Sequence, residues 1–414
     1  MDKIELGKVA EYITEKISVD EVRIEDYIST ENMLPNKGGI CLASNKPATG
    51  KVTRYQKGDI LTSNIRPYFK KIWLADRDGG CSNDVLVIRN KQGYLPYYLY
   101  YVLSEDKFFD YSTASAKGTK MPRGDKTAIM QYLVPKYAID IQERIIEILK
   151  NIDKKIQVNS KLNANLVLLS QNLYNQWFVD FEYPIGDSES YKTSGGAFVE
   201  SELGNIPLGW SIRQLSDVSQ CQNGRAFYKE GYDSEGAMVI DLGNVDVNGN
   251  FIYTNADKFI SMERYDNAKL EKYRVFKDDL IMVMTDRKST MDLLGKTGKV
   301  YRNTPFLLNQ RMYRIRSLIN TNYLYTTLNS KRVLDSLKER ALGSVQKYVN
   351  TGDINSLNIL VAPDSIMNKF SEIVDPIFKA IEVRLEENER LNILRDSLLP
   401  KLMSGEMELS DIEI

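Results

Sequence analysis

Histidine is absent from the whole chain of 414 residues. This absence excludes Ser-His-Asp and Cys-His catalysis, and it removes the side chain that most often binds transition metals in proteins. A carboxylate–magnesium nuclease remains possible in principle, but no compact Asp/Glu-x-Lys group lies on an expected strand. We therefore predict no catalytic residue and no metal ligand in this chain.

Cysteines and long apolar runs are also scarce. The three cysteines, Cys41, Cys81 and Cys221, are far apart, form no metal-binding spacing and are typical of a reducing compartment. No apolar run approaches the roughly 20 residues of a membrane span. The charged start, "MDKIELGKVAEYI", lacks the apolar core of a signal peptide. These features predict a cytoplasmic protein without membrane contact.

Net charge is almost absent as well, because the formal charge is −1. With 43% hydrophobic and 27% charged residues, the composition is ordinary for a globular protein. The length is sufficient for about two to three domains. Because the molecule as a whole is not a polycation, any nucleic-acid site must be a local basic patch.

What the chain does contain is a duplication. The segment "GDKTAIMQYLVP" (124–135) aligns with "GDINSLNILVAP" (352–363) at an offset of 228 residues. Further matches join "KGDIL" to "KDDLI", "SNDVLVIR" to "NQRMYRIR", and "AKGTK" to "ALGSVQK". A period this long indicates two copies of one domain rather than a solenoid. Short strand-like and helical runs alternate in each copy, which predicts an α+β (α/β-type) tandem repeat.

Each copy ends in a long apolar stripe with steps of three and four residues, which is typical of a coiled coil. The stripes predict two long antiparallel helices, at 141–181 and 364–405, with Pro376 at a kink or a helix start. We expect recognition domains at 1–140 and 211–363, a mobile polar linker at 182–210 and a tail at 406–414. The residues expected in the helix seam are Ile145, Ile152, Asn159, Leu166, Leu173, Ile377, Ile381, Asn388, Leu394 and Leu398.

Asn159 and Asn388 interrupt the two stripes near their midpoints. In an antiparallel pair the midpoints meet, so the two amides are expected in the same or adjacent layers, where they can hydrogen-bond and penalise slipped registers. The alternative is that both face solvent where the stripe drifts around the helix.

Positive charge is concentrated in one window of each copy. Between Lys37 and Lys71 there are eight basic residues and one acidic residue, and between Thr285 and Arg316 there are eight and two. Lysine and arginine at this density can neutralise phosphates, and interleaved amides and hydroxyls can read base edges. A solvated strand face is the alternative for either window.

Two short loops, 116–120 and 341–347, contain Gly118 and Gly343, which allow close backbone approach to a ligand; ordinary turns are the alternative. The candidate DNA contacts in the first copy are Lys46, Lys51, Arg54, Asn64, Arg66, Tyr68, Lys70, Lys71, Lys117, Thr119 and Lys120. Those in the second copy are Arg225, Arg287, Lys288, Ser289, Asn309, Gln310, Arg311, Ser344, Gln346 and Lys347.

The stretch "NIRPY" (64–68) resembles the Asn-Pro-Pro-Tyr box that adenine methyltransferases place around a flipped base. It has one residue too many, with Arg66 where the first proline should be, and no Gly-rich loop for a nucleotide-like methyl donor is found. We expect instead a strand end turned by Pro67 with Tyr68 packed inward, or a basic-aromatic DNA-contact loop.

Four motifs on this duplicated plan resemble the specificity subunit of type I restriction–modification systems. They are "GDILTSNIRPYFKK" (58–71), "NQWFVDFEYP" (175–184), "LGNIPLGWSIRQLSDV" (203–218) and "LLPKLMSGE" (398–406). The resemblance covers essentially the whole chain. The first copy starts abruptly at Lys3, without the "IPLGW" segment that precedes the second copy.

The resemblance implies that each domain reads one half of a split double-stranded DNA sequence. It also implies that the helices fix the gap between the halves and dock two modification subunits, which bind S-adenosylmethionine and methylate adenine. A separate motor-nuclease restriction subunit would cut DNA, so this chain binds no cofactor and is no enzyme. Two alternatives are a self-contained DNA adenine methyltransferase and a coiled-coil scaffold that does not bind DNA.

Overall fold

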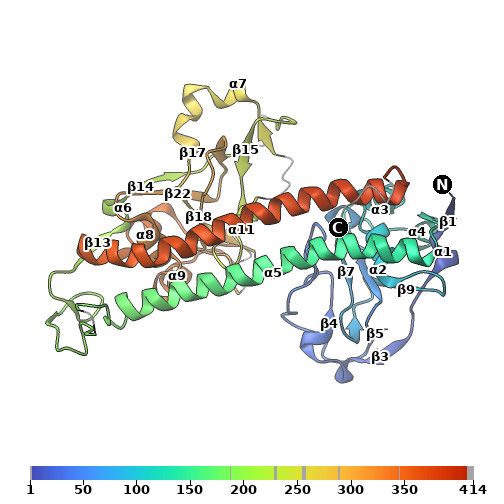
Figure 1. Cartoon of the computed structure of the whole chain (residues 1–414), viewed down its shortest axis with the longest axis horizontal. Coiled ribbons are helices and arrows are strands. Elements are labelled where there is room, and N and C mark those ends of the chain that lie inside the picture. The colour runs from blue at the N-terminus through green and yellow to red at the C-terminus, as the bar shows by residue number, and fades with distance from the viewer. Residues whose placement is uncertain are drawn as a thin grey trace. The chain divides into compact units, whose positions relative to one another are not determined.

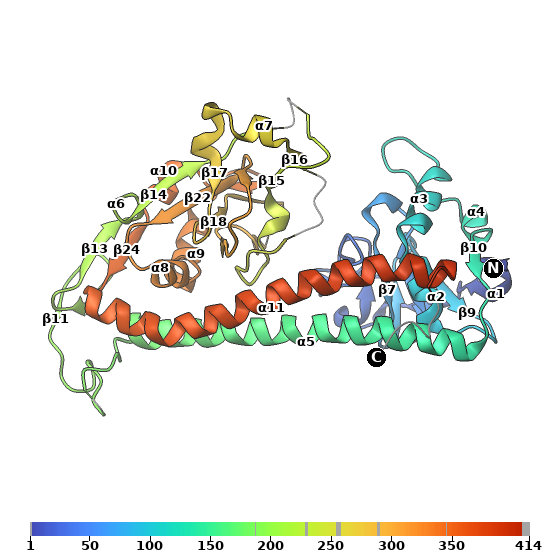
Figure 2. The same cartoon turned by 45° about the horizontal axis from the view of Figure 1, so that its top comes forward.

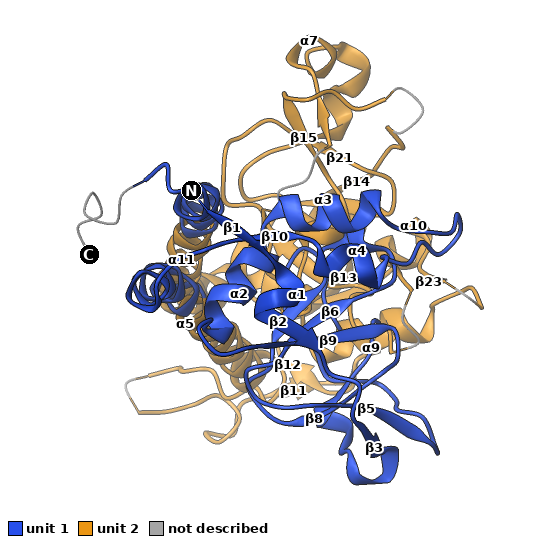
Figure 3. Cartoon of the chain, turned by 90° about the vertical axis from the view of Figure 1, so that its right-hand side faces the viewer, with its two compact units in different colours: residues 1–156, 390–414 blue, residues 157–389 orange. Residues whose placement is uncertain are grey.

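The computed structural model describes residues 2–186, 188–227, 231–253, 258–287, 290–344 and 346–407. The chain forms two compact units, one of residues 1–156 and 390–414 and one of residues 157–389 (Figure 3). Two helices of about 40 residues, α5 (Ile139–Phe178) and α11 (Asp364–Ser404), each contribute to both units (Figure 1).

Unit 1 contains two four-stranded sheets. The inner sheet has the order β2 (Ala10–Tyr12), β9 (Val85–Asn90), β6 (Ile60–Ser63) and β7 (Ile72–Leu74), and all its strand pairs are antiparallel. The outer sheet has the order β3 (Lys16–Ser18), β5 (Lys51–Tyr55), β8 (Gly79–Cys81) and β4 (Tyr27–Ile28). A small ladder joins β1 (Lys3–Glu5) to β10 (Leu133–Pro135), and the helices are α1 (Leu6–Val9), α2 (Pro96–Leu103), α3 (Asp106–Ala114) and α4 (Lys126–Met130).

Unit 2 repeats this inner sheet. Its order is β14 (Ser219–Asn223), β22 (Met312–Ser317), β18 (Leu280–Val283) and β20 (Thr297–Lys299), again antiparallel throughout (Figure 2). The equivalent small ladder joins β13 (Ser211–Gln214) to β24 (Asn358–Val361), and the equivalent helices are α6 (Leu215–Val218), α8 (Thr321–Leu328), α9 (Lys331–Glu339) and α10 (Thr351–Asn355).

The second sheet differs between the units. In unit 2 its order is β16 (Phe259–Ile260), β15 (Ala237–Ile240), β21 (Phe306–Leu308) and β17 (Arg274–Val275), with the parallel pair in the middle, whereas in unit 1 the parallel pair lies at the edge. Unit 2 adds α7 (Met262–Tyr265) and the short ladders of β11 (Phe198–Val199) with β12 (Ile206–Pro207) and of β19 (Thr285–Asp286) with β23 (Lys347–Tyr348). The two units therefore share the strand order and pairing of the inner sheet but differ in those of the outer sheet.

Near the C-terminal end of each copy, the offset between equivalent residues differs from the expected 228 positions. Tyr98 donates its hydroxyl to the carbonyl of Pro135, and Tyr323 donates to the carbonyl of Leu360. Both pairs of equivalent residues differ by 225 positions, and so do the starts of α5 and α11. The expected offset of 228 is wrong here, because a shift of three residues preserves helical periodicity and deceives a pattern match.

The segment expected as a mobile linker is packed in the part that the structure describes. The ring of Tyr183 stacks on Tyr191 and on Trp210, with centroids 4.8 Å and 5.4 Å apart. Tyr183, Ile206 and Trp210 are buried in the core of unit 2 together with Phe178, the last residue of α5. The aromatic residues of this segment therefore fix its path.

In unit 2 the two long helices run antiparallel, because Asn159 lies beside Asn388 while Asn163 reaches Ile381 (Figures 1 and 2). The hydrogen bond expected between the two amides is present, at 3.0 Å from Asn159 Nδ2 to Asn388 Oδ1. Asn159 Nδ2 also donates to Glu387 Oε2 at 2.7 Å. At the offset of 225, however, the equivalent of Asn388 is Asn163, so the bonded pair is not a symmetric one.

The seam follows the predicted stripe only in part. Ile145, Asn159 and Ile381 are buried, and Ile152, Leu166, Leu173, Ile377, Asn388 and Leu398 are half-buried. The prediction for Leu394 is wrong, because its side chain is exposed. Asn163 and Ser170 are buried instead of the neighbouring Leu162 and Leu169, so the seam is more polar than an apolar stripe suggests. Pro376 lies inside α11 and does not start it.

Candidate DNA-recognition surface

An ion pair with a buried carboxylate lies at the start of the equivalent strand, β6 or β18, in both units. Arg89 forms two hydrogen bonds to Asp59, both at 2.7 Å, and Arg316 forms two to Asp279, at 2.7 Å and 2.8 Å. Each carboxylate also accepts a backbone N–H from the residue three positions before it. These bidentate bonds hold β6 against β9 and β18 against β22, and the hydrogen bond to Asp279 raises the pKa of Arg316.

Beyond these strands the backbone again follows one pattern. In unit 1 the Asn64 N–H donates to the Asp84 carbonyl at 2.8 Å, and the Asn64 carbonyl accepts from Gly124 at 3.0 Å. In unit 2 the Met284 N–H donates to the Arg311 carbonyl at 3.0 Å, and the Met284 carbonyl accepts from Val349 at 3.0 Å. The strand end is thus sandwiched between the same two segments in both units.

A short hairpin loop lies beside each of these strand ends. The ion pair, the strand end and this loop are together called the frame of each unit. Lys117 and Arg123 exchange two backbone hydrogen bonds of 2.9 Å, and Leu342 and Tyr348 exchange two of 2.9 Å and 3.0 Å. Gly118 and Gly343 have φ of 97° and 91°, left-handed values that favour glycine. The loops noted in the sequence as possible ligand contacts therefore lie directly beside the strand ends.

Most basic residues of the first window are engaged within unit 1. Lys46 donates to the carbonyls of Val19 and Val22, Arg54 pairs with Glu15 at 3.0 Å, and Lys37 and Lys70 share Asp106 at 3.0 Å each. Lys71 donates to the Thr30 carbonyl at 2.6 Å, and burial lowers the pKa of its amine. Lys51, Lys120 and Thr119 are exposed, and Lys117 is exposed but pairs with Asp125 at 2.7 Å.

The "NIRPY" stretch lies at this surface. Asn64 is buried, and its side-chain oxygen has no hydrogen-bond partner among the described residues. Arg66 has φ of 50° and reaches the carbonyl of Lys120 at 3.4 Å. Tyr68 is 48% exposed and packs against Phe69, so the expectation that it packs inward is wrong. Both aromatic residues lie in the 3₁₀ turn Pro67–Phe69, which follows β6 in the chain.

The second window contains two kinds of basic residue. Lys299, Arg302, Arg314 and Arg316 bind partners inside unit 2: acidic side chains for Lys299, Arg302 and Arg316, and the carbonyls of Lys272 and Arg274 for Arg314. Burial lowers the pKa of both Lys296 and Arg314. Arg287 and Arg311 are exposed, whereas Lys288 and Ser289 lie outside the described residues.

The remaining candidates of the second copy gather beside Arg311. The Gln310 N–H donates to the Arg225 carbonyl at 2.8 Å, and Asn309 forms an isolated bridge with Arg225. Ser344 is exposed on the loop, and Lys347 lies in β23 opposite Asp286. Gln346 donates its amide to Thr285 at 2.8 Å. The expectation that these residues share one surface agrees with their placement, while the DNA contacts themselves stay a prediction.

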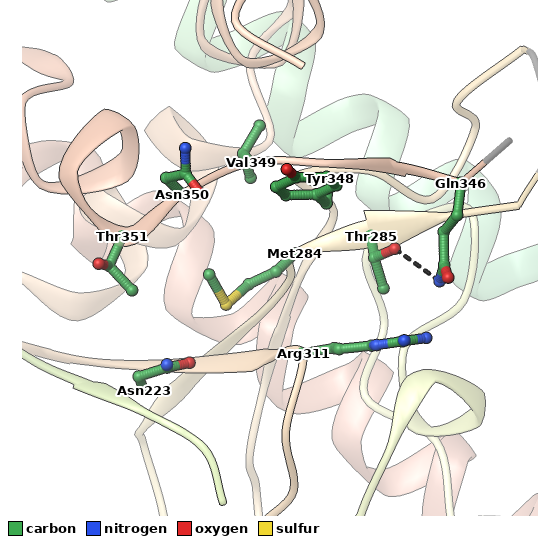
Figure 4. Close-up of a pocket in the computed structure, with 9 residues that line it drawn as sticks. All are labelled: Asn223, Met284, Thr285, Arg311, Gln346, Tyr348, Val349, Asn350 and Thr351. Carbon is green, nitrogen blue, oxygen red and sulfur yellow. Dashed lines mark hydrogen bonds between the residues drawn. The ribbon is translucent and has the colours of Figure 1, made fainter. Parts of the chain in front are cut away.

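A cavity of about 530 Å³ opens between the loop and the strand end of unit 2 (Figure 4). Among the candidates it is lined by Arg311 and Gln346, and it is also lined by Met284, Thr285, Tyr348 and Asn350. These last four residues were not among the predicted contacts. The signal for Tyr348 and Asn350 required an offset of 225 rather than 228, whereas Met284 and Thr285 follow the matched segment "KDDLI", whose offset is 220.

Among the described residues, no group of three or more potential metal ligands occurs, and no helix is long and apolar enough to cross a membrane. The three cysteines are free thiols.

Comparisons with known proteins agree with this architecture. Residues 207–393 match the family described as the type I restriction modification DNA specificity domain. The chain is 24% identical to the HindI specificity subunit of Haemophilus influenzae, over 97% of this chain and 98% of that protein. It is 24% identical to the MjaIX specificity subunit of Methanocaldococcus jannaschii, over 86% and 79%. These relatives are specificity subunits of restriction enzymes.

The same fold occurs in a solved structure, that of the S subunit of a type I restriction–modification system from M. genitalium. The TM-score is 0.50 and the identity 15%, over 97% of this chain and 96% of that one. The HindI subunit and this structural neighbour are each matched over nearly the full length of both chains. Residues 207–393 thus match a type I restriction modification DNA specificity domain, and the chain as a whole is similar to specificity subunits of type I restriction–modification systems in sequence and in fold.

Proposed function

We propose that this chain reads a bipartite double-stranded DNA sequence, with one unit for each half. The observation that carries the proposal is the repeated frame: the same ion pair, strand end and hairpin loop occur once in each unit. A frame present twice in one chain supplies two equivalent reading surfaces. Exposed lysines and arginines beside each frame would contact phosphates and position the duplex.

Methylome sequencing tests the bipartite reading. The chain is co-expressed with its modification subunit, and residues 1–138 are then replaced by the equivalent domain of a relative. We expect one half of the methylated sequence to change while the other half and the gap stay the same. A change in both halves would contradict the assignment of one unit to one half.

The long helices would dock the modification subunits. Within unit 2, α5 carries the exposed apolar side chains of Val158, Leu162, Leu168 and Leu169. In unit 1, α11 exposes Ile393 and Leu394. Clusters of exposed apolar side chains on a helix favour a protein partner. S-adenosylmethionine would bind in these partners, a motor-nuclease restriction subunit would join the assembly, and the complex would act in the cytoplasm.

Co-purification tests the docking. Replacing Leu168 and Leu169 by lysine should reduce recovery of the modification subunit, because a buried ammonium without a partner is costly. The matched control is Asn172→Lys, an exposed polar position on the same helix. Equal recovery with both variants would show that this face is not the docking surface.

A further inference from the structure

The two frames carry different side chains at equivalent positions. Asn64 corresponds to Met284, Asp84 to Arg311, and Arg123 to Tyr348, as their backbone hydrogen bonds define. In unit 1 the side chains of Asp84 and Arg123 pair with each other at 3.0 Å. In unit 2 an arginine and a tyrosine replace this pair, and the space beside them is the cavity of Figure 4. The duplicated backbone thus presents a different set of polar groups in each unit.

Arg311 and Arg287 are the exposed arginines of their window, and of these two Arg311 lines the cavity. Its guanidinium forms no ion pair or hydrogen bond with the residues that the structure describes, whereas Arg302, Arg314 and Arg316 are all engaged. Its φ of 70° places a non-glycine residue in the left-handed region. Such conformations persist where the surrounding structure imposes them, and they concentrate at functional sites. The exposed side chain of Arg311 thus starts from a constrained backbone position and lines the cavity.

Gln346 is fixed on the opposite wall. Its amide nitrogen donates to the Thr285 hydroxyl at 2.8 Å, and this hydroxyl donates to the Lys347 carbonyl at 2.9 Å (Figure 4). The relay orients the amide and leaves its oxygen and second N–H available to a ligand. Met284 supplies an apolar floor. A polar group held in place before binding loses less conformational entropy when the ligand arrives.

We propose that this cavity is the base-reading site of the second unit, with Arg311 as the residue that specifies a guanine and Gln346 as the residue that reads the neighbouring base. The inference rests on the proposed function. An arginine fork matches the O6 and N7 acceptors of guanine in the major groove, and a glutamine amide matches the donor and acceptor of adenine. Because unit 1 presents Asp84 and Arg123 at the equivalent positions, the two half-sites differ in sequence.

Methylome sequencing of Arg311→Ala, Arg311→Lys and Gln346→Ala, each co-expressed with the modification subunit, tests the proposal. Arg311→Ala should lose the preference for guanine at one position of one half-site, by roughly ten- to a hundredfold, with the other half and the gap unchanged. Arg311→Lys retains the charge but lacks the fork, so it should lose most of the same preference. Gln346→Ala should relax an adjacent position.

The matched control is Arg213→Ala, an exposed arginine in β13 that does not line the cavity, and it should leave the methylated sequence unchanged. Thermal melting of each variant monitors folding. Unchanged sequence preference in both arginine variants overturns the proposal, and so does a uniform loss of methylation without a change in sequence, since that outcome indicates a phosphate contact. If the wild-type complex methylates no bipartite sequence, the proposed function fails instead.

Discussion

At the residue scale, arginines of one window serve two purposes. Arg316 is fastened to the buried carboxylate of Asp279 and holds the inner sheet, whereas Arg311, five residues earlier, is exposed at the cavity. The duplicated pair of Arg89 and Asp59 identifies the first purpose, because an interaction kept in both frames maintains the frame. A basic residue in a DNA-binding domain is therefore not by itself a DNA contact.

Loss of the ion pair should destabilise unit 2. Arg316→Ala leaves the buried Asp279 carboxylate with a single backbone donor, and we expect a cost of about 3 kcal/mol in the free energy of unfolding. The measurement is denaturant unfolding of a Trp73→Phe background, in which Trp177 and Trp210 report on unit 2. The exposed Arg213→Ala should change the value by less than about 0.5 kcal/mol. Equal effects of both variants would refute a structural role for Arg316.

Glu105 should make unit 1 sensitive to pH. The side chain is buried at the start of α3, and burial raises its pKa to about 7. Because the folded state binds this proton more tightly than the unfolded state, the stabilising contribution is present below the ordinary glutamate pKa and is lost as pH rises through about 7.

The stability of the wild-type unit 1 should therefore decline between about pH 4.5 and 7, and Glu105→Gln should remove this decline. Above about pH 7 the variant should be more stable than the wild type, by the order of 1–3 kcal/mol. Labelling of the buried Cys81 thiol against pH measures opening of unit 1. Glu143→Gln, at an exposed position of α5, should retain the decline. A decline that persists unchanged in Glu105→Gln would assign it to another group.

At the scale of elements, the long helices are matched through polar contacts as well as apolar ones. Asn159 binds both Glu387 and Asn388, Asn388 also donates to Ser160 at 3.3 Å, and Asn163 and Ser170 are buried nearby. The hydrogen bond from Asn159 to Glu387 was not expected from the sequence, and replacing Asn159 by leucine would remove it. A slip in register would separate several polar partners at once, which favours a single alignment.

A double-mutant cycle tests this seam. Asn159→Leu should cost about 1–3 kcal/mol, because it removes the hydrogen bonds that Asn159 donates to Glu387 and Asn388, while Asn388→Leu should cost less, because Asn159 keeps Glu387. The double variant should cost less than the sum, with a coupling energy of about 0.5–2 kcal/mol. Unfolding of unit 2 by denaturant provides the values. Strictly additive costs would mean that the two amides do not interact in solution.

At the scale of the whole molecule, the chain returns to its first unit at its end. Leu399, Leu402 and Met403 of α11 are buried in the core of unit 1 with Ile145 and Leu149 of α5. Arg395 pairs with Asp153 at 3.1 Å, and Tyr137 donates to the Leu402 carbonyl at 2.8 Å. Residues more than 240 positions apart in sequence therefore complete one core.

Leu402→Ala should consequently weaken unit 1 and spare unit 2. Removal of this buried side chain should cost about 2–4 kcal/mol. Hydrogen exchange resolved by peptide should show faster opening of β6 and β9, with β18 and β22 unchanged. Ile393→Ala, at an exposed position of the same helix, serves as the control and should alter neither. Equal acceleration in both units would mean that they unfold as one.

The sequence alone determined the duplication, the two long helices and the resemblance to specificity subunits. These features depend on local patterns repeated along the chain: apolar spacing predicts helices, and matched segments indicate equal domains. The absence of histidine likewise limited the chemistry without any coordinates. Even the contact between Asn159 and Asn388 followed from antiparallel geometry applied to two interrupted stripes.

Only the tertiary structure decided the register of 225, the exposure of Tyr68 and Leu394, and the division of the basic residues into engaged and exposed ones. A shift of three residues keeps an apolar helix face apolar, so the apolar pattern does not distinguish an offset of 225 from one of 228. The backbone hydrogen bonds of a sheet are compatible with only one of the two offsets. The partner of an arginine is set by residues that fold beside it, as Asp279 does for Arg316. Such contacts leave no trace in local sequence.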